Sequence, residues 1–212
     1  MGLNKLQALK IIQLLNKSIK NPKTSLKFRN QFTLLTSVVL SAQCNDNNVN
    51  NVTKDIYKNY YTPKHFVDLG IKKIKEMIKS IGLFNMKAKN LYNLSKILVS
   101  KHQSRVPNNF EDLINLPGVG RKTANVVLNA AFDKPTIGVD THIFRVSNRT
   151  GLTSGKTPNQ VEEQLLKILP IKYLKKVHHL ILLHGRYICK SRSPLCTKCI
   201  INKICLYKDK NV

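Results

Sequence analysis

The 212-residue sequence has no tryptophan and few acidic residues, with 11 aspartates and glutamates against 36 lysines and arginines. The resulting net charge of +25 excludes an acidic, solvating chain and favours polyanionic partners, of which nucleic acid is the most general. Lysine outnumbers arginine and asparagine is abundant, so drift toward A/T-rich codons is an alternative source of part of this charge. Charge alone therefore leaves the partner open.

Long apolar runs are also missing. No run approaches the ~18 to 20 apolar residues that cross a bilayer, and the lysines spread through residues 1–20 argue against a signal peptide. We expect a cytoplasmic protein with no membrane anchor. An amphipathic helix is expected at the N-terminus, because one helical stripe there holds Leu6, Leu9, Ile12, Leu15 and Ile19.

Patterns typical of β-strands are absent, since alternating β-branched runs are not found. Helical segments with capping residues occupy most of the chain instead. In one of them Thr157 is suited to cap the helix, Pro158 to begin it and Gln160 to complete a capping box, before Pro170 ends the segment. The sequence therefore predicts an all-α fold.

Four cysteines lie within one short segment, "CKSRSPLCTKCIINKIC", while Cys44 stands apart and is expected inside a helix. Disulfides are disfavoured in a cytoplasmic chain, so the cluster predicts a metal site. Structural zinc usually takes two separated Cys-x-x-Cys pairs, and only one is present. Four thiolates from a compact loop suit a 4Fe–4S cluster better. The expected ligands are Cys189, Cys196, Cys199 and Cys205.

Basic residues are interleaved with these cysteines. They are Lys190, Arg192, Lys198 and Lys203. A basic loop fixed by a cluster would present cations to a phosphate backbone, whereas the alternative is that the charges only solvate the loop.

Residues 110–132 are predicted to form a helix, a tight turn and a second helix. Pro117 blocks continuation of the first helix, and Gly118 and Gly120 permit positive φ or close backbone approach. The N–H groups at the start of the second helix would bind an anion readily. A P-loop does not fit, because an arginine separates Gly120 from Lys122 and a helix precedes the turn. A helix-hairpin-helix that grips a DNA phosphate without reading sequence fits better.

Several motifs together resemble the endonuclease III family of bacterial helix-hairpin-helix DNA glycosylases. They are "LPGVGRKTA", "VDTHIFRV", "LLTSVVLSAQ", "IGLFNMKAKN" and the Cys-x6-Cys-x2-Cys-x5-Cys tail, which span nearly the whole chain. The resemblance implies two all-α domains: a six-helix domain at residues 24–134 carrying the hairpin, and a cluster domain from residues 1–23 and 135–212. It also implies a nucleoid-associated monomer, with a 4Fe–4S cofactor, acting on double-stranded DNA that contains damaged bases or abasic sites.

The resemblance further implies catalytic roles. Lys122 would attack C1′, expel an oxidised pyrimidine and, through a Schiff base, cut the strand 3′ to the abasic site by β-elimination. A neighbouring cation, a helix start and partial burial are expected to favour the neutral amine that this attack needs. Without the family pattern, a simple phosphate-binding lysine would be the preferred interpretation. Asp140 would assist departure of the base and stabilise positive character at C1′, and it is also suited to cap the helix that Gly151 ends.

By the same resemblance, Gln43 and Leu83 would fill the space that the extruded nucleotide leaves. Their alternatives are a polar residue at a helix end and a core leucine. The remaining expected DNA contacts lie in the hairpin, at Gly118, Val119, Gly120, Arg121 and Thr123. Two other functions stay open: an adenine-mismatch glycosylase, whose relatives lack the lysine, and a non-catalytic iron–sulfur DNA-binding module. Lys122 argues against the first, and Lys122 together with Asp140 argues against the second.

Overall fold

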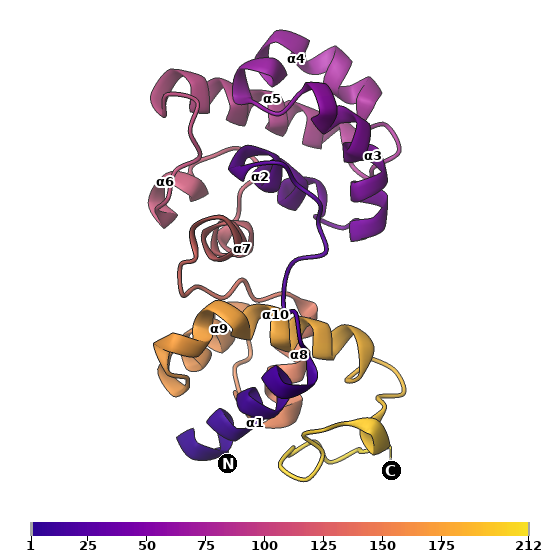
Figure 1. Ribbon diagram of the computed structural model, residues 1–212, viewed down its shortest axis with the longest axis vertical. Coiled ribbons are helices and arrows are strands. Elements are labelled where there is room, and N and C mark those ends of the chain that lie inside the picture. The colour runs from indigo at the N-terminus through magenta and orange to yellow at the C-terminus, as the bar shows by residue number, and fades with distance from the viewer. Residues whose placement is uncertain (1, 212) are drawn as a thin grey trace. The chain divides into compact units, whose positions relative to one another are not determined.

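The computed structural model describes residues 2–211, which form ten α-helices and one short 3₁₀ helix and contain no β-strand. The predicted all-α fold is confirmed. These residues divide into two compact units (Figure 1): Thr24–Asp133 forms one, and the residues up to Lys23 and from Lys134 onward form the other. Within the described range no helix is long and apolar enough to cross a bilayer.

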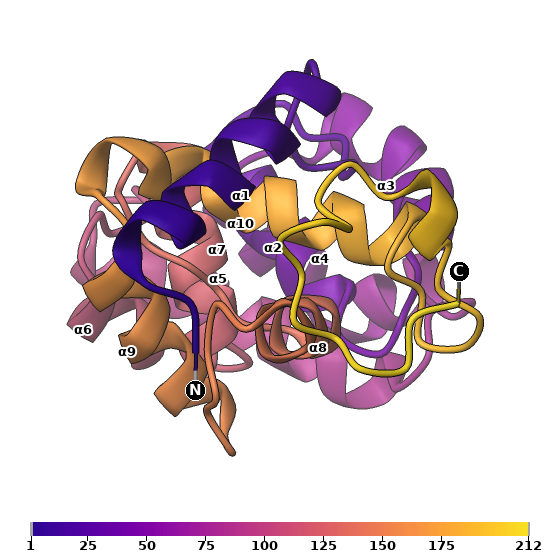
Figure 2. The same ribbon diagram turned by 90° about the horizontal axis from the view of Figure 1, so that it is seen from below.

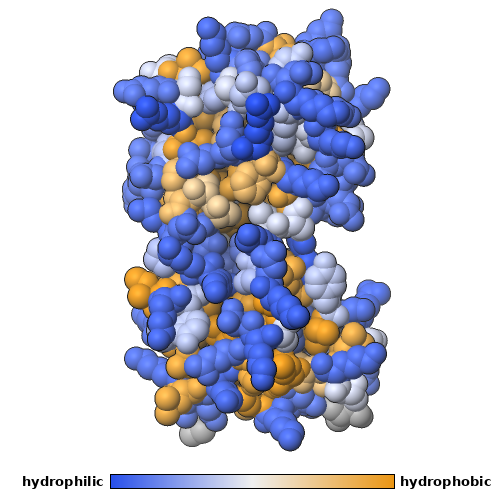
Figure 3. Space-filling model, in the orientation of Figure 1, coloured by the Kyte–Doolittle hydropathy of each residue, from blue (hydrophilic) through white to orange (hydrophobic). Residues whose placement is uncertain are grey.

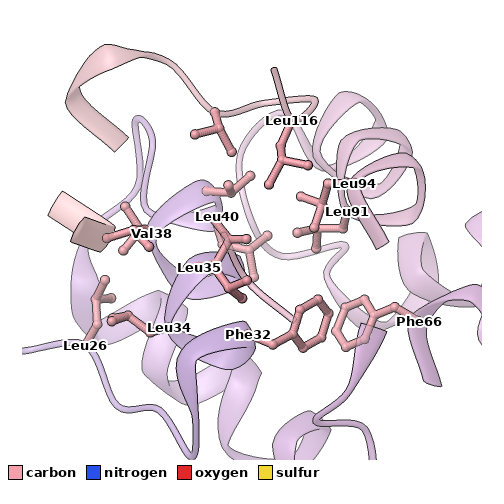
Figure 4. Close-up of a cluster of buried hydrophobic side chains, with 14 of the residues drawn as sticks. Leu26, Phe32, Leu34, Leu35, Val38, Leu40, Phe66, Leu91, Leu94 and Leu116 are labelled. Carbon is pink, nitrogen blue, oxygen red and sulfur yellow. The ribbon is translucent and has the colours of Figure 1, made fainter. Parts of the chain in front are cut away.

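The Thr24–Asp133 unit is built around a helix that is buried on all sides. Its elements are α2 (Gln31–Leu40), α3 (Asp46–Asn59), α4 (Pro63–Met77), α5 (Phe84–Lys101), α6 (Phe110–Ile114) and α7 (Arg121–Phe132). Every residue of α2 from Phe32 to Leu40 is buried, and the helix packs against α3, α5 and α7. In Figure 4 the ring of Phe32 points toward that of Phe66 on α4, edge to face, with centroids 5.2 Å apart.

The second unit is built on α10 (Ile171–Tyr187), which packs against α1 (Lys5–Ser18) and α8 (Thr141–Thr150) (Figure 2). It also contains α9 (Pro158–Ile168) and the 3₁₀ helix η1 (Cys196–Lys198). The expected stripe on α1 was wrong at its first position, because Leu6 is 78% exposed. The buried face runs through Ala8, Ile11, Ile12 and Leu15, and a residue two positions before Ala8 lies on the opposite side of a helix.

Local capping residues set several boundaries as expected. Thr157 accepts a hydrogen bond from the Gln160 amide, Pro158 is the first residue of α9, and the helix ends at Ile168, before Pro170. The expected capping box was wrong in its second bond, because the Gln160 side chain accepts from Lys156 N at 2.7 Å, one residue before the cap. Cys44, however, does not lie in a helix. It occupies the bend between α2 and α3. Helix α2 ends at Leu40, and α3 begins at Asp46, directly after its N-cap residue Asn45.

Candidate functional site

The predicted helix-hairpin-helix is formed by α6, a six-residue turn and α7. The turn is closed by two hydrogen bonds, from Leu116 N to Leu113 O at 3.1 Å and from Val119 N to Leu116 O at 3.0 Å. Val119 is 5% exposed and belongs to the core of the unit. The turn is therefore a packed element, with its apolar residues inward and its backbone at the surface.

The two glycines of the turn meet different demands. Gly118 has a φ of +80°, and a Cβ there would lie 2.9 Å from Asn90 Nδ2 on α5 and 3.0 Å from Asn90 Cβ. It therefore needs both the left-handed backbone and the close approach expected of it. Gly120 has a φ of −92°, and a Cβ there would meet no heavy atom within 4 Å. Neither the backbone conformation nor the packing within the protein therefore requires a glycine at position 120.

The start of α7 has no side-chain cap, because its N-cap residue is Gly120. The first N–H groups of a helix have no intrahelical carbonyl partner, so here they are available to an anion. Arg121 adds a positive charge, with its guanidinium 5.2 Å from the centroid of the Phe110 ring. Hydrophilic side chains cover much of the face of the molecule shown in Figure 3, with hydrophobic patches between them.

Lys122 is the second residue of α7 and is exposed, while Thr123 is half-buried. The partial burial expected for Lys122 is therefore absent. The reason is its position on the helix: the buried face of α7 begins at Ala124, and Lys122 lies outside it. Two of the three features expected around the amine remain, namely the neighbouring arginine and the helix start.

Asp140 lies in the other unit and caps α8. Its Oδ1 accepts a hydrogen bond from the Ile143 amide at 2.8 Å, and its carbonyl accepts one from Phe144 N at 2.8 Å. The C-cap residue of α8 is Gly151, with a φ of +84°. The expected capping role of Asp140 is confirmed, and it holds the half-buried carboxylate in one orientation.

Gln43 and Leu83 lie close together in the Thr24–Asp133 unit. Both are exposed, and both have a left-handed backbone conformation, with φ values of 54° and 61°. A Cβ on Gly82 would lie 3.9 Å from Gln43 O, which places the two segments side by side. The core-leucine alternative for Leu83 is wrong, because this residue is 51% exposed and precedes the first turn of α5.

Lys87 was missed by the sequence analysis. It is 2% exposed, and its Nζ donates hydrogen bonds to Leu40 O at 2.9 Å and Ala42 O at 2.6 Å. The sequence did contain a signal, because Lys87 lies four residues before Leu91 on the buried stripe of α5. A lysine on an apolar stripe requires buried partners.

The four clustered cysteines line one pocket. Its lining also includes His184 and Tyr207, and it contains about 330 Å³ of space free of protein atoms, open to solvent. None of the four forms a disulfide. Within residues 2–211, however, no set of three or more His, Cys, Asp or Glu side chains is arranged to hold a metal ion. The pocket thus gathers the expected ligands without forming a single-ion site.

The chemistry of this pocket suits a cationic metal centre. Burial raises the pKa of the Cys199 and Cys205 thiols, and the surrounding cysteines raise both further. Burial also lowers the pKa of His184 to about 4, so this imidazole is neutral at pH 7. Its Nε2 lies 3.6 Å from Cys199 Sγ. A bound metal centre would offset the cost of ionising these thiols, so the residues present fit an iron–sulfur group.

Two arginines of α8 hold the start of the cysteine loop, and the sequence analysis missed both. Arg145 donates to Cys189 O from Nε at 3.2 Å and from Nη2 at 3.1 Å. Arg149 donates to Lys190 O at 2.7 Å and to Ser191 O at 2.9 Å. No short motif reveals such bonds, because they join residues about forty positions apart. The interleaved cations are all exposed: Lys190, Arg192, Lys198 and Lys203.

Comparisons with known proteins agree with this geometry. Residues 36–171 match the HhH-GPD superfamily of base excision DNA repair proteins. The chain is 54% identical to endonuclease III of Rickettsia conorii over 198 residues, covering 93% of this chain and 94% of the relative. It is 48% identical to endonuclease III of Escherichia coli K12 over 208 residues, covering 98% and 99%. A solved structure of a trapped endonuclease III–DNA covalent intermediate matches with a TM-score of 0.90 and 41% identity, covering 96% of each chain.

Proposed function

The chain belongs to the HhH-GPD superfamily of base excision DNA repair proteins, and we propose that Lys122 is the nucleophile with which it acts on damaged DNA. It is a base excision repair DNA glycosylase and abasic-site lyase. The observation that carries the assignment of Lys122 is its place at an uncapped helix start, exposed and beside Arg121. An amine there can reach a ligand that the adjacent N–H groups hold by a phosphate.

In the proposed reaction, the neutral Lys122 amine attacks C1′ and the bond from C1′ to the base breaks, so that the base leaves with the electron pair. The departing base takes up a proton, and the attached nitrogen gives one up. The sugar ring then opens at the C1′–O4′ bond, O4′ takes up a proton, and the nitrogen lone pair completes a protonated Schiff base, which makes the C2′ proton acidic. Loss of that proton and of the 3′ phosphate cuts the strand by β-elimination, and water then releases the enzyme. The exposure of Lys122 supports this role, since no protein group has to move to free the amine.

We propose that Asp140 stabilises the positive charge that develops at C1′ as the base departs. A carboxylate held by a helix amide keeps its orientation through the reaction, and Asp140 has such a bond at 2.8 Å from Ile143. The proposed phosphate grip uses the turn backbone at Gly118 and Gly120. Arg121 and Thr123 are the proposed side-chain contacts, while the buried Val119 supports the turn from inside.

We propose that the cysteine pocket holds a 4Fe–4S cluster through Cys189, Cys196, Cys199 and Cys205. A cluster takes one cysteine at each of its four irons. The four residues line one pocket, so a single short loop offers the four thiols that such a cluster needs, which supports this choice. When bound, the cluster would fix the loop, so that its exposed lysines and Arg192 meet DNA phosphates.

Borohydride trapping tests the proposed nucleophile. The protein is incubated with a duplex containing one abasic site, borohydride is added, and covalent complexes are separated by denaturing electrophoresis. We expect an adduct with the wild-type protein and none with Lys122→Gln, which removes the amine but keeps a polar side chain of similar length. The variant should still bind the duplex. An equal adduct in both proteins would overturn the assignment.

We further propose that the excised bases are oxidised pyrimidines and that a monomer acts, since one chain carries both Lys122 and Asp140. Duplexes with thymine glycol opposite adenine and with 8-oxoguanine opposite cytosine separate the two lesion classes. We expect cutting of the first only. Light scattering of the protein with and without duplex measures the stoichiometry, and a two-to-one complex would contradict the monomer.

A further inference from the structure

Lys87 is a buried cation that neither the proposed reaction nor the hairpin uses. Its side chain is 2% exposed, and the hydrogen bonds described for its Nζ go to two carbonyl oxygens, those of Leu40 and Ala42. Burial lowers the pKa of Lys87 from its ordinary value. An ammonium in such a place is costly unless strong acceptors surround it, so the two carbonyl oxygens are needed to stabilise it.

The partners lie at the C-terminal end of α2. The last four carbonyls of a helix have no intrahelical donor, and the helix dipole places partial negative charge there. Leu40 is the final residue of α2, and Ala42 follows in the turn that leads to Gln43. Lys87, although it belongs to α5, therefore closes the end of α2 and fixes the backbone directly before Gln43.

Lys87 itself lies on the segment that Leu83 begins. Its amide donates the first backbone hydrogen bond of α5 to the carbonyl of Leu83, the N-cap residue, at 3.0 Å. One residue thus joins the two segments whose tips are Gln43 and Leu83. A second link runs in parallel, since Asn48 Nδ2 donates to Ser80 O at 3.2 Å and lies 3.4 Å from Cys44 Sγ.

These links hold two residues in a backbone conformation that side chains rarely adopt. Gln43 and Leu83 both have positive φ and both are exposed, and left-handed residues other than glycine persist only where their surroundings fix them. Without Lys87, the end of α2 would lose two charge-assisted hydrogen bonds, and the Gln43 turn would be free to relax.

We propose that Lys87 is a positioning residue that sets Gln43 and Leu83 as a paired wedge for the space left when a nucleotide leaves the duplex. This inference rests on the proposed function, because it assigns Lys87 a part in extruding the nucleotide on which Lys122 acts. It assigns Lys87 no contact with DNA. The wedge matters only where a base has to be displaced from a stacked duplex.

The test compares two substrates that share the Lys122 chemistry. One is a duplex with a single oxidised pyrimidine, which requires extrusion, and the other is a single-stranded oligonucleotide with an abasic site, which does not. Rates are measured under single-turnover conditions, by strand cutting for the duplex and by borohydride trapping for the single strand. The variant is Lys87→Met, which keeps the length and apolar stem. Lys89→Met, an exposed site on the same helix, is the control for loss of one positive charge.

We expect Lys87→Met to lower the duplex rate about tenfold and the single-strand rate less than about twofold. Lys89→Met should change neither the duplex rate nor the single-strand rate. In a double-mutant cycle, adding Lys87→Met to Gln43→Ala should slow the duplex reaction little further, because the first change acts through the residue that the second removes.

A parallel loss on both substrates, or fully additive effects in the cycle, would overturn the proposal. If Lys87→Met does not fold, Lys87→Gln, which keeps N–H donors, is measured instead, and the same duplex-to-single-strand ratio decides. Failure of the proposed function is distinguishable, because the wild-type protein would then neither cut the duplex nor form a trapped adduct with the single strand.

Discussion

The starts of α7 and α8 each carry one candidate catalytic side chain, and they are built in opposite ways. At α8 the candidate, Asp140, is itself the cap and accepts the Ile143 amide at 2.8 Å. At α7 the cap position is Gly120, which has no side chain, and the candidate Lys122 is exposed. The carboxylate is therefore part of the folded structure, whereas the lysine contributes little to it. Substitutions at the two sites should separate activity from stability in different ways.

The largest expected effect is at Lys122. Lys122→Gln should reduce strand cutting at least about 10³-fold, because the covalent step loses its nucleophile. The melting temperature should stay unchanged, because an exposed side chain away from packing contributes about 0.5 kcal/mol or less to stability. Single-turnover cutting and thermal unfolding measure the two quantities. A large fall in melting temperature would contradict the contrast between the two helix starts.

At Asp140, in contrast, one side chain should contribute to both activity and stability. Two substitutions separate these contributions. Asp140→Asn keeps a capping oxygen but removes the charge, so activity should fall about 10²-fold with little change in stability. Asp140→Ala should lose similar activity and a further ~1 kcal/mol of folding free energy. Urea unfolding measures the stability of both variants, and strand-cutting assays measure their activity. Equal stability of the two variants would show that the cap contributes nothing.

The two glycines of the hairpin give a matched pair on the α7 side. Gly118→Ala should destabilise the protein by about 2 kcal/mol, because alanine strains a left-handed backbone and would crowd Asn90. Chemical denaturation measures this loss. DNA affinity should weaken as well, because Gly118 belongs to the proposed phosphate grip. Wild-type stability of the variant would contradict the packing seen at Asn90.

Gly120→Ala should have the smallest effect on the fold, about 0.5 kcal/mol, since a Cβ there meets no protein atom and φ is −92°. Its effect should appear in binding instead. Affinity for an abasic duplex should weaken several-fold, because the added methyl occupies the space where a phosphate approaches the backbone. Fluorescence anisotropy at fixed salt measures this, and unchanged affinity would remove Gly120 from the proposed phosphate grip.

Features set by a few adjacent residues could be predicted from the sequence. The hairpin follows from proline and glycine next to apolar residues, and the caps at Thr157 and Asp140 follow from their positions before helical stripes. Features that depend on packing between distant segments could not. Leu83 was expected to be exposed only through the family resemblance, and Lys87 was missed because its partners, Leu40 and Ala42, lie more than forty positions away.

The cysteine loop shows both cases at once. Four cysteines in one segment predicted a shared site, and they do line one pocket. The loop is held by Arg145 and Arg149 of α8, which donate to backbone carbonyls. Every residue has such a carbonyl, so the loop sequence does not indicate these bonds. The cofactor itself follows from donor chemistry and stays a proposal.

The most direct test of the central claim is to locate the covalent bond. The wild-type protein is trapped with borohydride on an abasic duplex, digested, and the DNA-linked peptide is identified by tandem mass spectrometry. The chain has 29 lysines, so an accidental attachment would spread over several sites. The account predicts a single modified residue, Lys122, at the start of α7. Attachment at another lysine or at the terminal amine would contradict it.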